Sequence, residues 1–249
     1  MIKYNSNVSC DKGDELCMID LHSHFLPGID DGAKTVDESI AMLTDSFFQG
    51  VKTIVATPHC ALHDNESVTS FLSRRSDSLD KILNAIRKNP VDIPDIRLGA
   101  EIYLDNDITE YDDLKKLCIE DTNYMLIEFP HIGFQSKSAE WLYELTLLGI
   151  KPIIAHIDRY AEWEEIFTSL ADIDVVYQVN SSNFTNLSGR IMLHRLFKYE
   201  VPFIASSDMH NMNKRPSCMG KAYLKSKKSF KTLSEDLFIN NAQEILRKA

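Results

Sequence analysis

Short apolar runs alternate with amphipathic stretches along this chain, and that alternation restricts its possible folds more than any other feature. The apolar runs have the length of strands and lie at residues 18–21, 53–56, 96–100, 124–129, 152–155, 175–179 and 203–206. Helical periodicity occurs between and after them, at residues 36–48, 67–88, 139–148, 161–170, 189–199 and 233–248. Strands that alternate with helices form parallel sheets with helical crossovers. The sequence therefore predicts an α/β fold.

The number of strand runs bears on the architecture. Seven runs in 249 residues suit a barrel-like β/α fold better than an open sheet, although the pattern leaves the closure of the barrel open. We find no internal repeat and no linker rich in proline or glycine. The chain is therefore expected to hold one domain over residues 18–249, preceded by a polar N-terminal extension over residues 1–17.

Charge and cysteine content narrow the functional classes. With 27 basic and 37 acidic residues the formal net charge is -10, which argues against nucleic acid as a main partner. No stretch is apolar enough for a membrane span or for the core of a signal peptide. The five cysteines are odd in number and contain no C-x-x-C pair, so we expect neither a disulfide framework nor a thiolate zinc site. A soluble protein of the cytoplasm is predicted.

Histidines and carboxylates follow the predicted strands. Five of the seven runs end in, or lead directly into, such residues: His22 and His24, His59, Glu101, His156, and Asp208 with His210. Each of them alone could be an ordinary hydrogen-bonded residue at a strand end. Because the carboxyl ends of parallel strands meet on one face of a β/α fold, where active sites lie, their repetition favours a common site.

The ligand types indicate metal ions. Asp31 joins the set because the turn-rich segment 28–32 can bring its carboxylate over the first strand end, although an ordinary turn is the alternative. Imidazoles and carboxylates without thiolates suit zinc, manganese or iron. Eight ligands exceed one tetrahedral ion, so two or three ions that share a carboxylate are predicted. Three divalent ions would outweigh three carboxylates by about three charges, which favours a phosphate dianion as the bound group.

Two arginines follow the ligand segments closely. Arg159 lies three residues after His156, and Arg215 lies five residues after His210. Their guanidinium groups could hold phosphate oxygens in bidentate contacts. A surface salt bridge is the rival interpretation, and it is stronger for Arg215 than for Arg159.

The sequence can be searched for the motif of a cysteine-based phosphatase. That chemistry needs a cysteine of low pKa with an arginine six residues later. The residue six positions after Cys60 is Glu66, and none of the other four cysteines has an arginine there. Phosphate chemistry in this chain would therefore depend on metal ions.

Six motifs in order carry a family resemblance. They are Asp20–His24, Pro27–Gly32, Thr57–His59, Gly99–Glu101, Ala155–Arg159 and Ser207–His210. Over about residues 18–249 the chain resembles the polymerase and histidinol phosphatase superfamily, and within it the bacterial metal-dependent tyrosine-protein phosphatases of capsule and exopolysaccharide operons. Such proteins typically begin near the position of Met18, so residues 1–17 depart from the family pattern.

The resemblance implies a distorted seven-stranded β/α barrel with a trinuclear site at the C-terminal ends of its strands. Manganese is the metal it implies, with zinc or iron as alternatives. The first ion would be held by His22, His24, Glu101 and Asp208, the second by Glu101, His59 and His156, and the third by Asp31 and His210 with help from His59. Arg159 and Arg215 match the arginines that hold phosphate in the family.

The resemblance also implies a substrate, namely phosphotyrosine on the tail of a membrane-bound tyrosine autokinase that controls polysaccharide synthesis. A small-molecule phosphatase of the same superfamily, acting on a substrate such as histidinol phosphate, is one alternative. A non-catalytic module that binds phosphorylated tails is another.

Overall fold

In the computed structural model, which describes residues 16–130 and 134–247, the strands pair with their neighbours in parallel. One sheet has the order β1–β2–β4, with bounds Met18–Ser23, Val51–Ala56 and Asp95–Leu98. The other has the order β3–β5–β6–β7–β8–β9, with bounds His59–Ala61, Glu101–Tyr103, Tyr124–Glu128, Lys151–Ile154, Val176–Asn180 and Phe203–Ser206. The predicted α/β class with parallel strands is confirmed.

The two sheets are joined where strands are interrupted. The chain leaves β2 and enters β3 across Thr57 and Pro58, and it leaves β4 and enters β5 across Gly99 and Ala100. Pro58 has no N–H to donate, but its carbonyl accepts a hydrogen bond from the N–H of Glu101 at 3.1 Å. These breaks divide the strand ladders of the described residues into two parallel sheets, of three and six strands.

The first and last strands also meet. Beyond β9, the N–H of Asp208 donates to the carbonyl of His22, and the N–H of His24 donates to the carbonyl of Met209, both at 2.9 Å. A parallel bridge joins Ser23 and Met209. The carboxyl ends of β1 and β9 therefore lie side by side although about 180 residues separate them in sequence.

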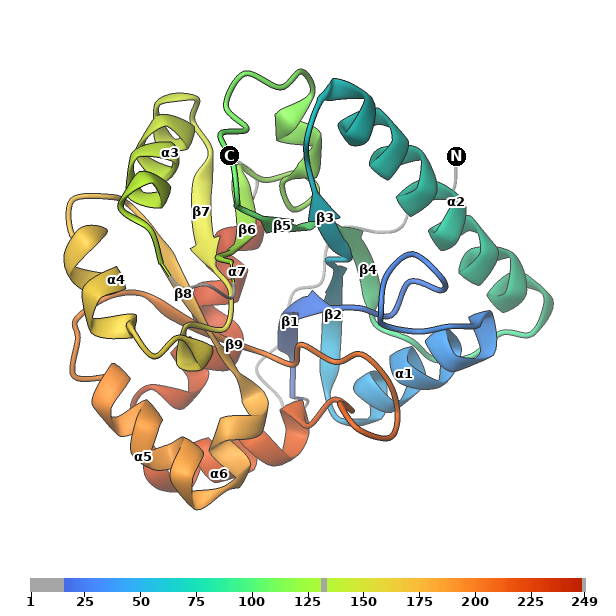
Figure 1. Ribbon diagram of the computed structural model, residues 1–249. Helices are drawn as coiled ribbons and strands as arrows, with labels where there is room; N and C mark the ends of the chain where they lie inside the picture. The colour runs from blue at the N-terminus through green and yellow to red at the C-terminus, as the bar shows by residue number, and fades with distance from the viewer. Residues whose placement is uncertain (1–15, 131–133, 248–249) are drawn as a thin grey trace.

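Helices surround the strands (Figure 1). Their bounds are α1 Val36–Phe48, α2 Asn65–Lys88, α3 Ser136–Leu147, α4 Trp163–Ser169, α5 Leu187–Leu196, α6 Met219–Ser229 and α7 Asn241–Leu246. Short helical turns are η1 Leu114–Leu117, η2 Ile157–Arg159, η3 Ser181–Thr185 and η4 Asp236–Asn240. At the start of α1 the hydroxyl of Thr35 accepts from the N–H of Glu38 at 3.2 Å and so caps the helix.

An apolar cluster fills the interior between the strands. Inward side chains from both sheets form it together with α7, and they include Ile19, Leu21, Val55, Leu126, Ile153, Val176, Ile204, Ala242 and Ile245. Figure 1 shows α7 behind the strands. Full burial of one such aliphatic side chain stabilises the fold by about 1.5–3 kcal/mol. The packed apolar layer therefore holds the strands, and with them the polar residues at their carboxyl ends, in fixed positions.

Among the described cysteines, Cys60, Cys118 and Cys218 are free thiols. Residues 1–15 of the predicted extension lie outside the described residues. Among the described residues, no helix is both long enough and apolar enough to cross a membrane.

Candidate metal centre

The fold brings all eight predicted ligands into one connected cluster at the strand ends. Neighbouring members lie between 3.0 and 3.6 Å apart, and the cluster comprises His22, His24, Asp31, His59, Glu101, His156, Asp208 and His210. Six of these side chains are almost fully buried, while those of His59 and Asp31 are 37% and 65% exposed. The cluster thus reaches from the interior to the solvent on one side.

Glu101 lies at the centre of the cluster. Its Oε2 atom is 3.1 Å from His22 Nε2, 3.2 Å from His24 Nε2 and 3.1 Å from His59 Nδ1. Although it is buried, this oxygen has no partner with hydrogen-bond geometry among the described residues. Its other oxygen, Oε1, is 3.0 Å from His156 Nε2. A buried carboxylate that faces several imidazole nitrogens without hydrogen-bonding to all of them has the arrangement of a bridging metal ligand.

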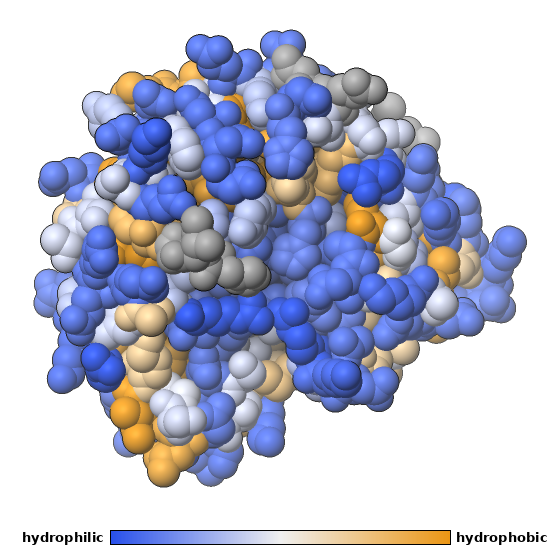
Figure 2. All heavy atoms as spheres, viewed as in Figure 1, coloured by the Kyte–Doolittle hydropathy of each residue, from blue (hydrophilic) through white to orange (hydrophobic). Residues whose placement is uncertain are grey.

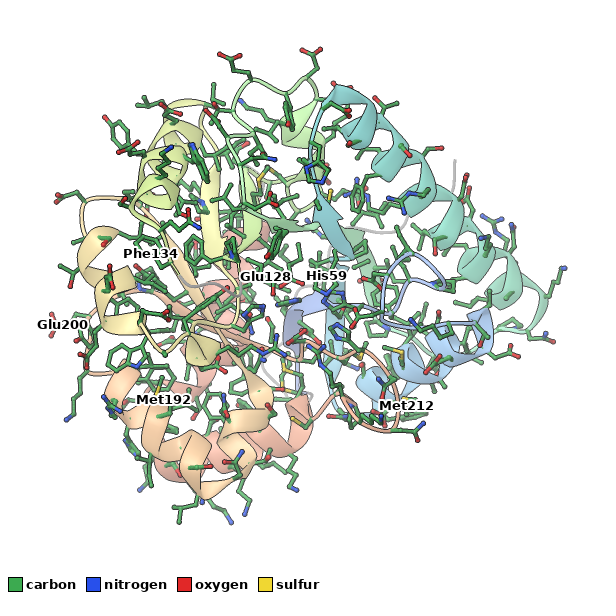
Figure 3. All side chains as sticks on the ribbon, viewed as in Figure 1. His59, Glu128, Phe134, Met192, Glu200 and Met212 are labelled. Atoms are coloured by element: carbon green, nitrogen blue, oxygen red, sulfur yellow. The ribbon has the colours of Figure 1, made fainter. Side chains whose placement is uncertain are left out.

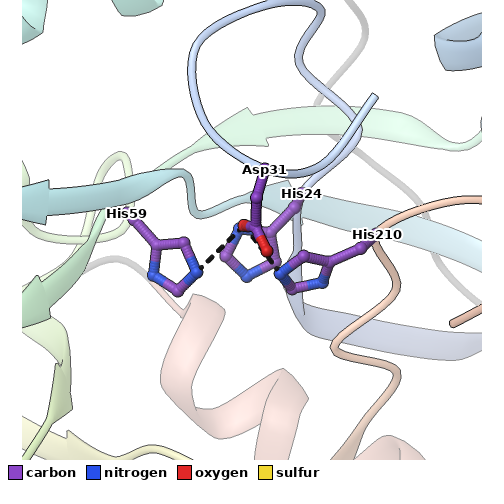
Figure 4. A group of neighbouring side chains, drawn as sticks. All are labelled: His24, Asp31, His59 and His210. Carbon is purple, nitrogen blue, oxygen red and sulfur yellow. Dashed lines mark ion pairs between the residues drawn. The ribbon is translucent and has the colours of Figure 1, made fainter. Parts of the chain in front are cut away.

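Three groups of donor atoms are compact enough to hold an ion, since within each group the donors lie within 4.8 Å of one another. The groups are His22, His24 and Asp208; His59, Glu101 and Glu128; and His24, Asp31, His59 and His210. Figure 4 shows the third group, in which Asp31 Oδ1 lies 3.2 Å from His210 Nε2 and 3.4 Å from His59 Nε2. His24 and His59 each belong to two groups, so the groups adjoin.

Glu128 is a member that sequence reasoning missed. It is the last residue of β6, and its carboxylate lies 3.4 Å from His156 Nε2 and 3.7 Å from His59 Nδ1. In Figure 3 Glu128 and His59 lie close together at the middle of the molecule. The predicted strand 124–129 placed Glu128 inside the strand instead of at its end. A carboxylate after the apolar run Met125–Ile127 was the signal that could have identified it.

Asp30 holds the first ligand segment in place. Its carboxylate is 2.8 Å from His24 Nδ1 and accepts the backbone N–H groups of His59 at 3.1 Å and Gly32 at 2.9 Å. A Cβ atom on Gly32 would stand 2.0 Å from the carbonyl oxygen of His24, so only glycine allows this turn to approach so closely. The segment is therefore more than an ordinary turn, because Asp30 directs His24 Nε2 toward the cluster.

The charges of the cluster favour a cation among its carboxylates. Burial opposes charge on His22, yet the charges of Glu101 and Asp208 raise the pKa of His22 to about 9. Burial likewise opposes charge on His59, but its contact with Glu101 raises the pKa of His59 to about 9. Burial would raise the pKa of Glu101, but His22 and His156 hold it well below its usual value. Positive charge close to Glu101 and Asp208 is thus stabilised, and divalent cations fit this donor set.

Arg159 and Arg215 both reach the cluster from its exposed side. Arg215 donates from Nη2 to Asp208 Oδ2 at 2.7 Å, and Arg159 Nη1 lies 3.3 Å from the same oxygen. Their side chains are 34% and 43% exposed. Both arginines therefore contact a buried carboxylate of the centre, and neither forms the simple surface salt bridge that was the rival interpretation. Figure 2 shows that this face is hydrophilic around its centre.

The free thiols are unsuited to nucleophilic chemistry. Cys60 is next to His59 in sequence but is only 2% exposed, and burial raises the pKa of its thiol to about 12. Burial also raises the pKa of Cys118 to about 11. These thiols stay protonated at neutral pH, so the chemistry of the site lies with its imidazoles, carboxylates and guanidinium groups.

This chain is similar in sequence to known proteins. A family model described as capsular polysaccharide synthesis, CpsB/CapC, matches residues 18–247. The tyrosine-protein phosphatase CpsB of Streptococcus pneumoniae is 32% identical over 246 residues, which cover 92% of this chain and 98% of that protein. The tyrosine-protein phosphatase YwqE of Bacillus subtilis is 30% identical over 240 residues, which cover 92% of each.

The fold is similar to a solved structure as well. In a crystallographic study of YwqE from Bacillus subtilis and CpsB from Streptococcus pneumoniae, described as unique metal-dependent tyrosine phosphatases, one chain superposes on this one with a TM-score of 0.78. The match covers 93% of this chain and 95% of the other at 28% sequence identity. Sequence and structure therefore agree on the relationship over nearly the whole chain.

Proposed function

This chain belongs to the CpsB/CapC family of capsular polysaccharide synthesis, and from that membership we propose that it is a metal-dependent protein-tyrosine phosphatase. The observation that carries the proposal is the environment of Glu101, a buried carboxylate whose Oε2 lies within about 3.2 Å of three imidazole nitrogens. Two arginines border the same cluster. This combination suits the hydrolysis of a phosphate monoester.

The proposal assigns the ligands to three ions, preferably manganese, with zinc or iron as alternatives. The first ion is assigned to His22, His24, Glu101 and Asp208, the second to His59, Glu101, Glu128 and His156, and the third to Asp31, His59 and His210. The compact donor groups and the shared position of His59 support this division. Imidazole with carboxylate is a donor set that these metals accept.

When bound, the ions supply a water molecule of lowered pKa and positive charge for the phosphoryl oxygens. The protein's own groups orient the substrate and the ligands. Arg159 and Arg215 hold phosphate oxygens through their guanidinium groups, since both reach the cluster while staying accessible to solvent. Asp30 fixes the direction of His24. No thiol takes part, because Cys60 is buried beside the site and lacks a partner arginine in sequence.

The proposed domain spans residues 18–249, in line with the family match over residues 18–247. We treat β2 with β3, and β4 with β5, as single strands that are each broken for two residues. Counted in this way, the nine strands become seven, which would form a distorted seven-stranded barrel. The backbone bonds between the ends of β1 and β9 support such an arrangement.

The proposed substrate is phosphotyrosine on the tail of a membrane-bound tyrosine autokinase, with hydrolysis in the cytoplasm regulating capsular or exopolysaccharide synthesis. The names of the relatives support the tyrosine-phosphatase activity, and the family description supports the capsular role.

The proposal is tested by comparing substrates and variants. Phosphate release from a phosphotyrosyl peptide and from histidinol phosphate is measured with the wild type, His22→Ala and Cys60→Ser. We expect the peptide to have the higher kcat/KM, His22→Ala to lose activity and Cys60→Ser to keep it. Preference for histidinol phosphate would instead favour the metabolite phosphatase. Tight peptide binding by the metal-loaded protein without turnover would favour the binding module.

A further inference from the structure

The inward face of β8 carries no histidine or carboxylate, yet it lies against the metal centre. Val176, Gln178 and Asn180 share that face, because side chains alternate along a strand. Val176 belongs to the interior apolar cluster, whereas Tyr177 and Val179 pack in the outer core. Gln178 is completely buried and Asn180 is 7% exposed. A buried amide without hydrogen-bond partners is destabilising, so the partners of these two residues indicate their role.

Three hydrogen bonds connect the two amides to ligand residues from three parts of the chain, and a fourth connects the amides to each other. Gln178 Oε1 lies 2.6 Å from the backbone N of His156 and 3.0 Å from His22 Nδ1. Gln178 Nε2 donates to Asn180 Oδ1 at 2.9 Å. Asn180 Nδ2 donates to Asp208 Oδ2 at 3.1 Å. We call this chain of bonds the amide relay.

One backbone group fixes the direction of the whole relay. The N–H of His156 can only donate, so the Gln178 atom that faces it must be the carbonyl oxygen. The amide nitrogen of Gln178 then faces Asn180, and the amide nitrogen of Asn180 faces the carboxylate of Asp208, which accepts. Since Gln178 Oε1 cannot donate, His22 Nδ1 must carry a proton to bond with it.

The relay therefore determines which nitrogen of His22 faces the centre. With Nδ1 protonated, Nε2 is the atom left to act as a ligand, and it points at Glu101 Oε2 at 3.1 Å and Asp208 Oδ1 at 3.5 Å. His24 is oriented in the same sense, because its Nδ1 faces Asp30 at 2.8 Å. His22 and His24 thus both direct Nε2 toward the centre. The Nδ1 atom of His22 is held by the amide of Gln178, and that of His24 by the carboxylate of Asp30.

The relay also bonds to two ligands with unusual backbones. His156 has φ of 31° and Asp208 has φ of 51°, both in the left-handed region that residues other than glycine rarely adopt. Such conformations are strained and persist only where the surroundings hold them. Gln178 binds the backbone of His156, and Asn180 binds the side chain of Asp208.

We propose that Gln178 and Asn180 are positioning residues that fix the ligand nitrogen of His22 and hold His156 and Asp208 in their ligand geometry. This inference rests on the proposed metal-dependent function. Strand β8, which carries no proposed ligand, would then orient ligands that lie on other segments of the chain.

The first test measures zinc and manganese affinity by competition with a chromophoric chelator, independently of catalysis. Gln178→Met removes the amide but keeps the length of the side chain, and we expect it to weaken binding about 10- to 100-fold. Gln178→Glu keeps an acceptor for His22 Nδ1 and for the N–H of His156, so it should bind within a few-fold of the wild type. Val179→Ala is the matched control, because its side chain is also buried on β8 but packs in the outer core.

The second test needs no variant. Two-bond 15N–1H correlation spectra of the zinc-loaded wild type should show His22 protonated at Nδ1. A proton at Nε2 of His22 would overturn this inference but not the proposed function. A Gln178→Met variant that binds metal as tightly as the wild type would do the same. An equal loss of affinity in Val179→Ala would overturn it too, since the effect would then reflect general destabilisation. Failure of the wild type to bind metal would overturn the proposed function and the relay with it.

Discussion

At the scale of single residues, Glu101 connects more of the centre than any other side chain described above. It faces four histidines through its two oxygens and is 1% exposed. A buried charge in this position is tolerable only with positive charge around it. The rule that located Glu101, a polar side chain directly after an apolar run, also located six of the other predicted ligands, whereas Asp31 was inferred from its turn-rich segment. The same rule would have located Glu128 had the strand end been placed correctly.

Glu101→Gln tests this role. The neutral amide has the same shape but cannot bridge cations as a carboxylate does, so we expect kcat/KM for a phosphotyrosyl peptide to fall by roughly 1,000-fold or more. Bound metal, measured by elemental analysis, should fall with it. Glu110→Gln is the control, because Glu110 is exposed beyond β5. Full metal content and activity in Glu101→Gln would contradict the assignment.

Arg159 and Arg215 give a second prediction at this scale. Substitution of either by methionine should lower kcat/KM by about 10- to 100-fold, because a charge-assisted contact to phosphate contributes about 1.5–3 kcal/mol. Metal content should stay unchanged, since neither side chain is a ligand. Arg195→Met, in which an exposed arginine beside Glu164 is removed, should behave as the wild type. The account would be wrong if the Arg195 variant lost as much activity as the other two.

At the scale of elements, the predicted strands and most helices match the structure within a few residues, because the short apolar runs and the period-3.6 patterns were clear there. The strand breaks at Thr57–Pro58 and Gly99–Ala100 were not predicted, since they depend on bonds between distant segments. Helix α6 was missed because its lysines and serines hide the apolar positions that pack inward. Gln178 and Asn180 gave no signal either, because amides inside a strand have no spacing rule.

Arg75 supports the break between β4 and β5. Its guanidinium donates to the carbonyl of Gly99 at 2.6 Å and to that of Lys116 at 3.0 Å, and the residue is 8% exposed. Arg75→Met should therefore lower the free energy of unfolding by about 1–3 kcal/mol, as two carbonyls lose their donor. Urea denaturation measures this. The exposed neighbour Arg74 is the control, and Arg74→Met should change stability by no more than about 0.5 kcal/mol. Equal effects at both positions would contradict the role of Arg75.

At the scale of the whole molecule, the centre gathers ligands from both sheets and from residues 22 to 210 of the chain. Metal binding should therefore stabilise the entire fold. At a free metal concentration 100 times the dissociation constant, the gain is about 2.7 kcal/mol. For a chain of this size that corresponds to a rise of about 5–10 °C in the thermal midpoint. Calorimetry with and without metal measures it, and an unchanged midpoint would argue against a site built from both sheets.

The formal net charge of -10 takes on a different meaning at this scale. It argues against nucleic acid as a partner, yet an acidic molecule can hold a cationic pocket, because field strength in a buried site depends on nearby groups and not on the total.

The central claim is that this pocket hydrolyses phosphotyrosine through bound metal. The most direct measurement is phosphate release from a phosphotyrosyl peptide by protein stripped with a chelator and then reloaded with manganese, zinc or iron. We predict that activity disappears with the metal and returns in proportion to the metal bound, whereas full activity in protein shown to be metal-free would contradict the claim.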